Sequence, residues 1–253
     1  MSKFTHHLTR CWYPYCAVLY FILFQLLCSM LPLLMPWNMS QAMVVIFSSL
    51  FSNLLTMIVL VYAGYITLDQ IRTSLTGKLL VAFMAFQLLA SFGMNVIEEF
   101  CEIPDLLADV MTAVMSNPLG VLAVAIVGPI AEELTFRGGL MGGLMKNGYS
   151  AKVAIIVSAL TFGIIHFNPV QVVFASAMGL LLGWAYWRTQ SLMPCILMHI
   201  ANNGFSVLMF YASENPEGRI TDEIGVVPSL ALMVVCLAAA YYLYKWLNKK
   251  LSK

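Results

Sequence analysis

Residues 118–142 read PLGVLAVAIVGPIAEELTFRGGLMG, an apolar run that carries charged side chains near its middle. A helix needs about 20 largely apolar residues to cross a bilayer, and this run is long enough. Each ionisable group at the bilayer centre costs roughly 2.5–3.5 kcal/mol, so the adjacent carboxylates of Glu132 and Glu133 require a compensating arrangement. The stretch therefore predicts a membrane-spanning helix with a polar site inside it.

The composition of the whole chain agrees with a membrane protein. Its 253 residues are 61% hydrophobic and 10% charged, whereas about 25% of the residues in soluble globular chains are charged. The net charge of +1 offers no basic excess for a phosphate backbone, so nucleic acid is not an expected partner. The six cysteines include no CxxC pair, which disfavours a disulfide framework and a thiolate zinc site. We expect a single integral membrane domain over residues 1–253, surrounded by membrane lipid.

The other apolar runs set the expected number of spans. They are continuous rather than alternating, which predicts helices. The expected fold class is an all-α membrane protein, a bundle of about eight transmembrane helices. The expected spans are residues 15–35, 42–66, 79–97, 118–142, 152–168, 170–187, 192–211 and 227–246.

Positively charged side chains predict the orientation of this bundle. With the N-terminus in the cytosol, twelve of the 13 Lys and Arg residues fall in the inner segments and only Arg219 falls outside. Basic residues favour the cytosolic side of a membrane protein. Both termini are therefore predicted to be cytosolic.

Helical geometry separates the roles of the two glutamates. Glu133 and Arg137 are four residues apart and can form an i,i+4 ion pair. Glu132 lies about 100° around the helix axis from its neighbour and faces another helix. We therefore expect Glu133 to be held by Arg137 and Glu132 to be free for chemistry. The alternative is that both acids only stabilise packing with Arg137.

Two histidines also lie in expected spans. His199 and Asn203 share one helix face, and so do Phe162 and His166. An imidazole and a carboxamide one turn apart can donate two hydrogen bonds to a single oxygen, as an oxyanion site does. A lone histidine in such a span is more often a packing residue, but these neighbours favour chemistry.

Three expected helices thus offer a carboxylate, an imidazole and an imidazole–amide pair. Peptide hydrolysis without a covalent intermediate needs a base that takes a proton from water and a partner that orients this water. It also needs donors for the charge that develops on the carbonyl oxygen. The residues therefore predict a hydrolase that acts on a peptide or protein at the membrane.

Three motifs, in order, carry a family resemblance. They are EELTFR at 132–137, FGIIH at 162–166 and HIANN at 199–203, which match the patterns EExxxR, FxxxH and HxxxN. The chain thereby resembles the CPBP family, also called Abi. This family of intramembrane proteases includes the Rce1-type CAAX prenyl proteases and bacteriocin self-immunity proteins. The resemblance covers about residues 118–211, the expected protease-like core.

The resemblance implies an eight-helix bundle with a cavity open toward the cytosol. It implies an intramembrane endopeptidase that cleaves a membrane-associated or lipid-modified protein or peptide. By this likeness Glu132 and His166 would activate water, while His199 and Asn203 would form the oxyanion hole. The supporting residues would be Glu133, Arg137 and Phe162. We expect a multi-pass protein in the cell (inner) membrane of a prokaryote.

A zinc-dependent version of the same protease is an alternative. Glu132, His166 and His199 could supply three ligands and leave a water position open. Against zinc, the chain has no HExxH helix and no third histidine in its spans. We favour a glutamate-driven reaction without a metal or other cofactor.

The depths of the two histidines disagree in a simple bundle. His166 lies roughly 20 Å along its helix from Lys152, whereas His199 lies about 13 Å from Arg188. Either helix 152–168 is tilted or begins below the membrane surface, or His166 is not part of the site.

Two functions other than proteolysis stay open. An immunity or regulatory membrane partner would keep the motif residues for structure alone. A proton-coupled carrier would use buried acids and histidines as relays, but no inverted repeat is visible in the two halves. Gly179 and Gly183, like the glycines of 138–143, are predicted to let helices pack closely within the chain.

Overall fold

A computed structural model describes residues 3–31, 39–212 and 219–252, with the side chains from residue 13 onward. Every regular element in these ranges is helical. The elements are α1 (Lys3–Met30), α2 (Gln41–Tyr62), α3 (Leu68–Ile71), α4 (Gly77–Glu99), α5 (Ala108–Met115), α6 (Pro118–Leu122), η2 (Ala123–Val127), α7 (Gly128–Glu133), η3 (Leu134–Met141), α8 (Gly142–Lys146), α9 (Ala151–Ile164), α10 (Pro169–Thr189), α11 (Leu192–Ala212), α12 (Ile220–Ile224) and α13 (Val226–Leu251). The expected all-α membrane class is confirmed.

The number of full-length spans differs from the expected eight. Within the described residues, seven helices are long and apolar enough to cross a membrane, and α9 is shorter. The span expected at 152–168 is the 14-residue helix α9, which ends at Ile164. It ends early because Phe167 has a φ of 51°, and the residue before Pro169 is excluded from the helical region. The protein is multi-pass, and its described residues form seven helices of spanning length and the shorter apolar helix α9.

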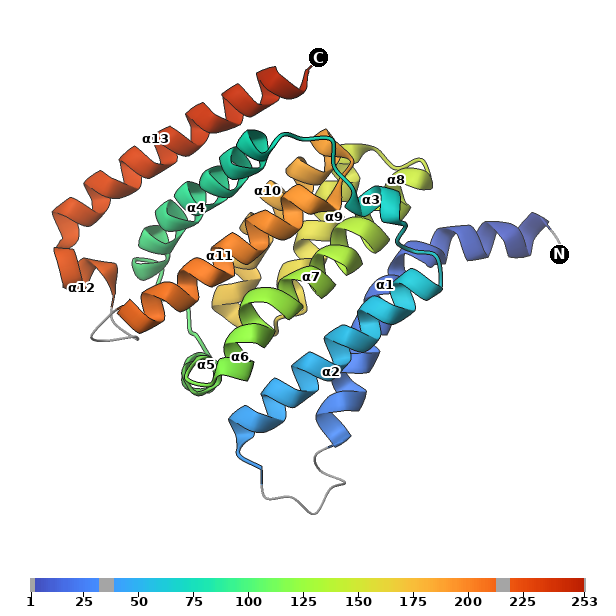
Figure 1. Cartoon of the computed structure of the whole chain (residues 1–253), viewed down its shortest axis with the longest axis horizontal. Coiled ribbons are helices and arrows are strands. Elements are labelled where there is room, and N and C mark those ends of the chain that lie inside the picture. Colours follow the sequence, from blue (N-terminus) through green and yellow to red (C-terminus); the bar gives the residue numbers. More distant parts are fainter. Residues whose placement is uncertain (1–2, 32–38, 213–218, 253) are drawn as a thin grey trace.

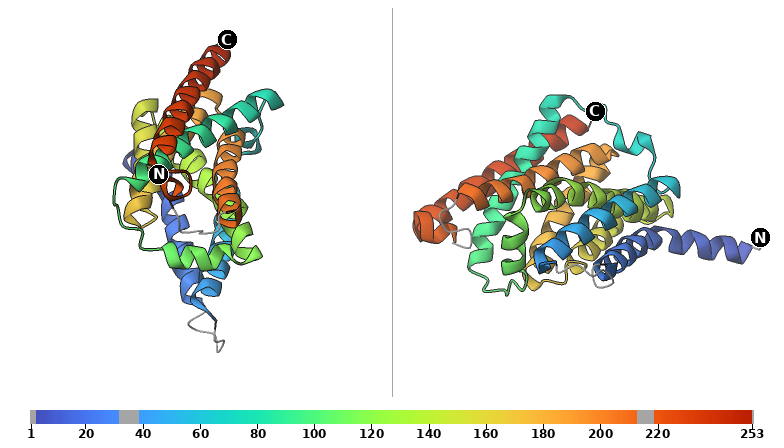
Figure 2. Two further views of the ribbon diagram at one scale, coloured as in Figure 1. Left: turned by 90° about the vertical axis from the view of Figure 1, so that its left-hand side faces the viewer. Right: turned by 60° about the horizontal axis from the view of Figure 1, so that its bottom comes forward.

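The helices run roughly alongside one another, and both termini lie at the same end of the bundle (Figure 1). α3 and α8 lie at this end, whereas α5 and α12 lie at the opposite end. Helix α9 packs along α10, α4 along α13, and α1 along α2, and two further views show the same layers (Figure 2). Termini at one end agree with an even number of crossings. Their location in the cytosol stays a prediction.

One helix forms the centre of this bundle. Elements α6, η2, α7, η3 and α8 join into a continuous span, Pro118–Lys146. In its most apolar 18-residue stretch 56% of the residues are buried within the protein, against 17–44% in the corresponding stretches of the other spans. Asn117 caps its start by accepting a hydrogen bond from the Leu119 amide, and Pro118 takes the first helical position. The most enclosed span is therefore the one that carries Glu132 and Glu133.

Glycines let neighbouring helices approach this central helix and each other. A methyl group on Gly139 would lie 2.6 Å from Cβ of Ala17 on α1. A methyl group on Gly179 would lie 2.9 Å from Cα of Ala159 on α9. Real Cβ atoms do not pack so closely, so these positions require glycine. As expected, these glycines let helices of the same chain pack closely against each other.

Candidate active site

A buried carboxylate connects the central helix to α11. Glu133 Oε1 lies 2.8 Å from Arg137 Nη1 and 2.8 Å from His199 Nδ1. The side chains of Glu133 and Arg137 are fully buried, and that of His199 is 2% exposed. The expected ion pair of Glu133 and Arg137 is therefore present. The bond from His199 Nδ1–H to Glu133 was not expected, because the sequence assigned Glu133 to Arg137 alone.

Glu132 faces the same imidazole from its other side. Its Oε2 lies 3.6 Å from His199 Nε2, and its side chain is 19% exposed. Glu132 faces another helix, as expected, and this helix is α11. The Arg137 guanidinium and the His199 imidazole are partners of the kind that two adjacent carboxylates need inside a membrane.

Arg137 and Phe162 tie this network to α9 and α10. Arg137 Nη2 donates to the Gly179 carbonyl at 3.3 Å, and the guanidinium lies 4.7 Å from the Phe162 ring centroid. The Phe162 ring meets both histidines edge-on, with centroid distances of 5.0 Å to His166 and 5.7 Å to His199. Phe162 thus contacts both imidazoles and limits the directions in which each can turn.

His166 lies just beyond the end of α9. Its Nδ1 donates to the Phe162 carbonyl at 2.8 Å, which leaves Nε2 for other partners. Within the described residues, His166 forms no ion pair with Glu132. The Phe162 ring contacts both imidazoles, so His166 and His199 lie near each other in spite of the depths expected from the sequence. His166 is therefore beside the network and not in contact with its carboxylates.

Asn203 contacts the central helix one turn before Gly128. Its Nδ2 donates to the Val124 carbonyl at 3.0 Å, and its Oδ1 accepts from Asn202 at 3.2 Å. Val124 lies in η2, where the hydrogen bonds run from residue i+5 to residue i, as from Gly128 to Ala123. The matching donor for Val124 would be Pro129, which has no N–H. Asn203 therefore supplies the donor that a proline removes, a role that sequence reasoning missed.

The carbonyl that holds the Asn203 amide and the Glu132 carboxylate lie along the same helix. Val124, Gly128 and Glu132 are each four residues apart. The carboxamide of Asn203 has a second N–H that is free of Val124. This part of the helix, together with His199, brings a carboxylate, an imidazole and an amide donor from α7 and α11 into one region. Such groups can activate water and bind an oxyanion.

The proposed zinc ligands do not form a ligand set. In the part of the chain that the structure describes, no group of three or more His, Cys, Asp or Glu side chains could hold a metal ion. Metal dependence of the reaction stays a prediction.

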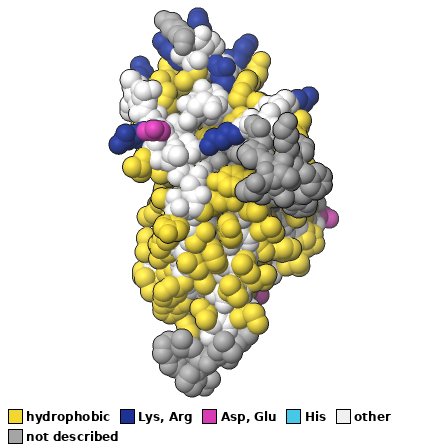
Figure 3. All heavy atoms as spheres, turned by 90° about the vertical axis from the view of Figure 1, so that its right-hand side faces the viewer, with side chains coloured by type: hydrophobic (Ala, Val, Ile, Leu, Met, Phe, Trp, Pro, Cys, Tyr) yellow, Lys and Arg dark blue, Asp and Glu magenta, His cyan; other side chains and the backbone are white. Residues whose placement is uncertain are grey.

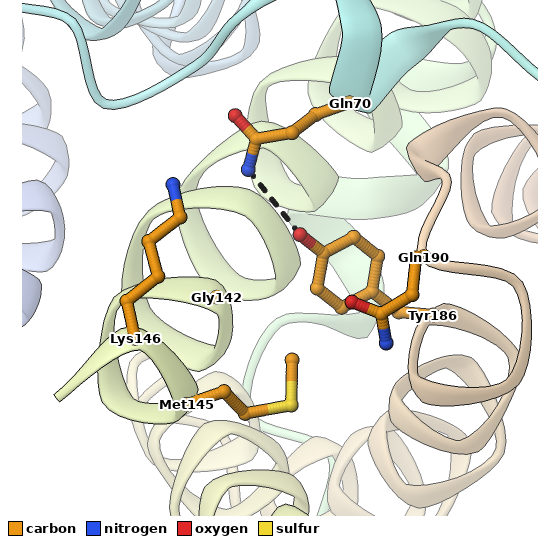
Figure 4. Close-up of a pocket in the computed structure, with 6 residues that line it drawn as sticks. All are labelled: Gln70, Gly142, Met145, Lys146, Tyr186 and Gln190. Atoms are coloured by element: carbon orange, nitrogen blue, oxygen red, sulfur yellow. Dashed lines mark hydrogen bonds between the residues drawn. The ribbon is translucent and has the colours of Figure 1, made fainter. Parts of the chain in front are cut away.

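A separate pocket lies at the end of the bundle that holds α3 and α8. It has a volume of about 320 Å³ and is lined by Gln70, Gly142, Met145, Lys146, Tyr186 and Gln190. Figure 4 shows Lys146 and Gln190 on opposite sides, with Gln70 Nε2 donating to the Tyr186 hydroxyl at 3.3 Å. None of the expected site residues lines this pocket.

Known proteins match the segment that holds this network. The family model for Rce1-like type II CAAX prenyl endopeptidases matches residues 114–205. YdiL of Bacillus subtilis (strain 168), a presumed membrane peptidase, is 34% identical over 100 residues, which are 40% of this chain and 41% of that protein. The membrane-embedded CAAX protease MroQ of Staphylococcus aureus (strain USA300) is 35% identical over 107 residues, which are 40% of this chain and 42% of that protein.

The matched region covers about two fifths of each of these relatives, and no solved structure matches the chain. The region nevertheless contains every expected site residue, from Glu132 to Asn203. It also contains the central helix from α6 to α8 and the helices that contact its glutamates. Residues 114–205 of this chain are therefore similar to the Rce1-like family of type II CAAX prenyl endopeptidases.

Proposed function

We propose that this protein is an intramembrane endopeptidase that hydrolyses a peptide bond of a membrane-associated or lipid-modified protein or peptide. The observation that carries the proposal is the His199 imidazole between two carboxylates, 2.8 Å from Glu133 and 3.6 Å from Glu132, on the most buried span. The family match supports the same class of reaction. Since both named relatives come from bacteria, we place the protein in a prokaryotic cell membrane.

Glu132 is the general base of the proposed reaction. Glu133 is fully buried and already accepts from Arg137 and His199, whereas the Glu132 side chain is 19% exposed. Glu132 takes a proton from water, and the hydroxide forms a bond to the carbonyl carbon of the substrate. The proton then passes to the leaving amine as the carbon–nitrogen bond breaks. His166 Nε2 is available to orient the water, since its Nδ1 is held by Phe162.

His199 and Asn203 are the donors of the proposed oxyanion hole. The Nε2–H of the imidazolium and the second N–H of Asn203 would donate to the tetrahedral oxygen. Glu133 orients His199 through Nδ1, and Val124 orients the Asn203 amide. We propose that the reaction uses no metal, because Glu132, His166 and His199 do not form a ligand set.

Replacing Glu132 by Gln tests the proposal. Membrane fractions of cells that carry the native protein or Glu132→Gln are compared by mass spectrometry of their peptides. The native protein should produce fragments with new termini, and the variant should lower their rate of formation by about 10²- to 10⁴-fold. Asp69→Asn is the control, because this carboxylate lies on a 90% exposed side chain. Identical peptide profiles for native protein and Glu132→Gln would contradict proteolysis.

The metal content of the purified protein separates the zinc-dependent alternative from the proposed metal-free reaction. The purified protein should contain less than one zinc per chain by elemental analysis and should stay active in chelator. Stoichiometric zinc whose removal abolishes cleavage would favour the metal mechanism.

A non-catalytic immunity or regulatory partner is the second candidate. Glu133, Arg137 and Asn203 all make bonds that a purely structural protein would also need. Glu132 makes none at hydrogen-bond distance within the described residues. A scaffold should therefore keep its phenotype in Glu132→Gln, whereas an enzyme should lose it.

A further inference from the structure

Helix α2 carries a row of buried polar side chains in a span of high hydropathy. Three of them bond to backbone carbonyls: Ser48 to Cys28, Ser52 to Ser49 and Thr56 to Ser52. Asn53 is 2% exposed and differs from these, because its carboxamide bonds to side chains. A buried amide in a membrane span is costly unless its groups are paired. The position of Asn53 therefore needs an explanation beyond helix formation.

The Asn53 amide is held in a defined orientation. Its Oδ1 accepts from Gln25 Nε2 on α1 at 3.1 Å, and its Nδ2 donates to Ser49 Oγ at 3.2 Å. A carboxamide nitrogen carries two hydrogens. One hydrogen is used by Ser49, so the second remains for another acceptor. The bond from Gln25 turns the Asn53 oxygen toward α1, and the bond to Ser49 fixes where the Asn53 nitrogen points.

Asn53 Nδ2 lies beside Glu132 at Gly128. A methyl group on Gly128 would lie 3.8 Å from Asn53 Nδ2 and 3.9 Å from Glu132 Oε1. The two polar atoms therefore flank the same point on the central helix. Because Gly128 has no side chain, a group the size of a water molecule can approach both of them. This point lies one turn from Val124, where Asn203 bonds, and α7 lies between α2 and α11 (Figure 1).

We propose that Asn53 is a further residue of the site, which holds the attacking water through its free amide hydrogen. The inference rests on the proposed function. Asn53 donates to the water oxygen, and one water hydrogen points to Glu132 Oε1. Glu132 takes this proton, and the hydroxide formed stays bound to the amide until its oxygen bonds to the carbonyl carbon. Residue 53 lies outside the segment 114–205 that the family model matches.

A role in packing alone makes a different prediction. The Gln25–Asn53 bond joins α1 to α2, and polar pairs of this kind also stabilise membrane helices. Gln25→Met removes the same interhelical bond but leaves the amide of Asn53 beside Gly128. Asn53→Leu removes the bond and the amide. Packing alone would affect both variants equally, whereas water positioning would affect Asn53→Leu more.

The test is steady-state cleavage by the full-length protein in lipid vesicles, with the substrate peptide found in the Glu132→Gln comparison. Asn53→Leu should lower kcat by about 10- to 100-fold with KM unchanged, since a misplaced reactant costs rates of this order. Gln25→Met should stay within about 3-fold of the native kcat. The unfolding temperature of each variant is measured in the same vesicles.

Gly128→Ala is a second variant that leaves the α1–α2 bond in place. Its methyl group would stand between Asn53 and Glu132, although it would also lie 3.0 Å from the Ala123 carbonyl. We expect a fall in kcat that resembles that of Asn53→Leu. A native kcat in Asn53→Leu, or an equal loss in Gln25→Met, overturns the inference while cleavage itself stands. Absence of Glu132-dependent cleavage by the native protein overturns the proposed function and the inference together.

Discussion

At the scale of single residues, the network depends on a carboxylate with no access to water. Glu133 is fully buried, and both of its close partners contact the same oxygen, Oε1. Removing one partner of a buried ion pair leaves a charge without compensation, which costs far more than losing an exposed pair. Arg137 therefore stabilises the fold as well as the site. This dependence explains why the EExxxR spacing places an arginine four residues after the second glutamate.

Arg137→Met should destabilise the protein by about 3–5 kcal/mol, because Glu133 loses its guanidinium in a buried place. The measurement is thermal unfolding in detergent micelles. Arg72→Met is the matched control, since Arg72 pairs with Asp69 at 3.7 Å through side chains that are 77% and 90% exposed. An exposed pair contributes about 0–1 kcal/mol. Equal unfolding temperatures for the two variants would contradict the structural role of Arg137.

At the scale of elements, the site depends on where helices end and how closely they approach. Helix α9 stops two residues before His166, so that this histidine lies in a turn. Gly163, inside the FxxxH motif, faces α10: a methyl group there would lie 2.6 Å from the Val172 carbonyl and would overlap Ser176 Oγ. Backbone atoms cannot give way as a flexible side chain can. The contact between α9 and α10 therefore fixes Phe162 and His166 in place.

Gly163→Ala should push α9 away from α10 and lower both the unfolding temperature and cleavage. Overpacking of this kind typically costs about 1–3 kcal/mol. Gly204→Ala is the control, because nothing lies within 4 Å of its added methyl group. A glycine inside a helix is replaced favourably by alanine, so Gly204→Ala should raise stability by about 0.4–1 kcal/mol. Changes of the same sign in the two variants would refute this view of the contact.

Sequence patterns could predict the parts of the site that lie on one helix. The spacing of Glu133 and Arg137 predicts their ion pair, and Asn168-Pro169 marks the start of α10. The bond from His199 to Glu133 depends on the relative rotation of two helices, about which the pattern of one helix carries no information. Pro129 in the sequence indicates that one backbone carbonyl of this helix lacks its N–H donor. Which carbonyl this is, and therefore which one Asn203 bonds, follows only from the i+5→i hydrogen bonds of the structure.

At the scale of the whole molecule, basic side chains are concentrated at one end of the bundle. On the face shown in Figure 3, Lys and Arg side chains gather at one end, above a broad hydrophobic band. The chain termini share one end of the bundle. This arrangement agrees with the prediction that both termini are cytosolic, since basic residues favour the cytosolic side of a membrane. The lipid-facing band explains why 61% of the residues are hydrophobic.

The short helix α9 has a consequence for the surrounding bilayer. Its 14 residues extend about 21 Å, whereas a hydrocarbon core is about 30 Å thick. Val153, Ile156, Leu160 and Ile164 are 40–56% exposed along one side, so lipid meets this helix directly. Cleavage should therefore be faster in vesicles of short-chain lipids than of long-chain lipids, and equal rates would contradict this. The bilayer has to thin locally to match α9, and this thinning, which brings bulk water closer to His166, costs less with short-chain lipids.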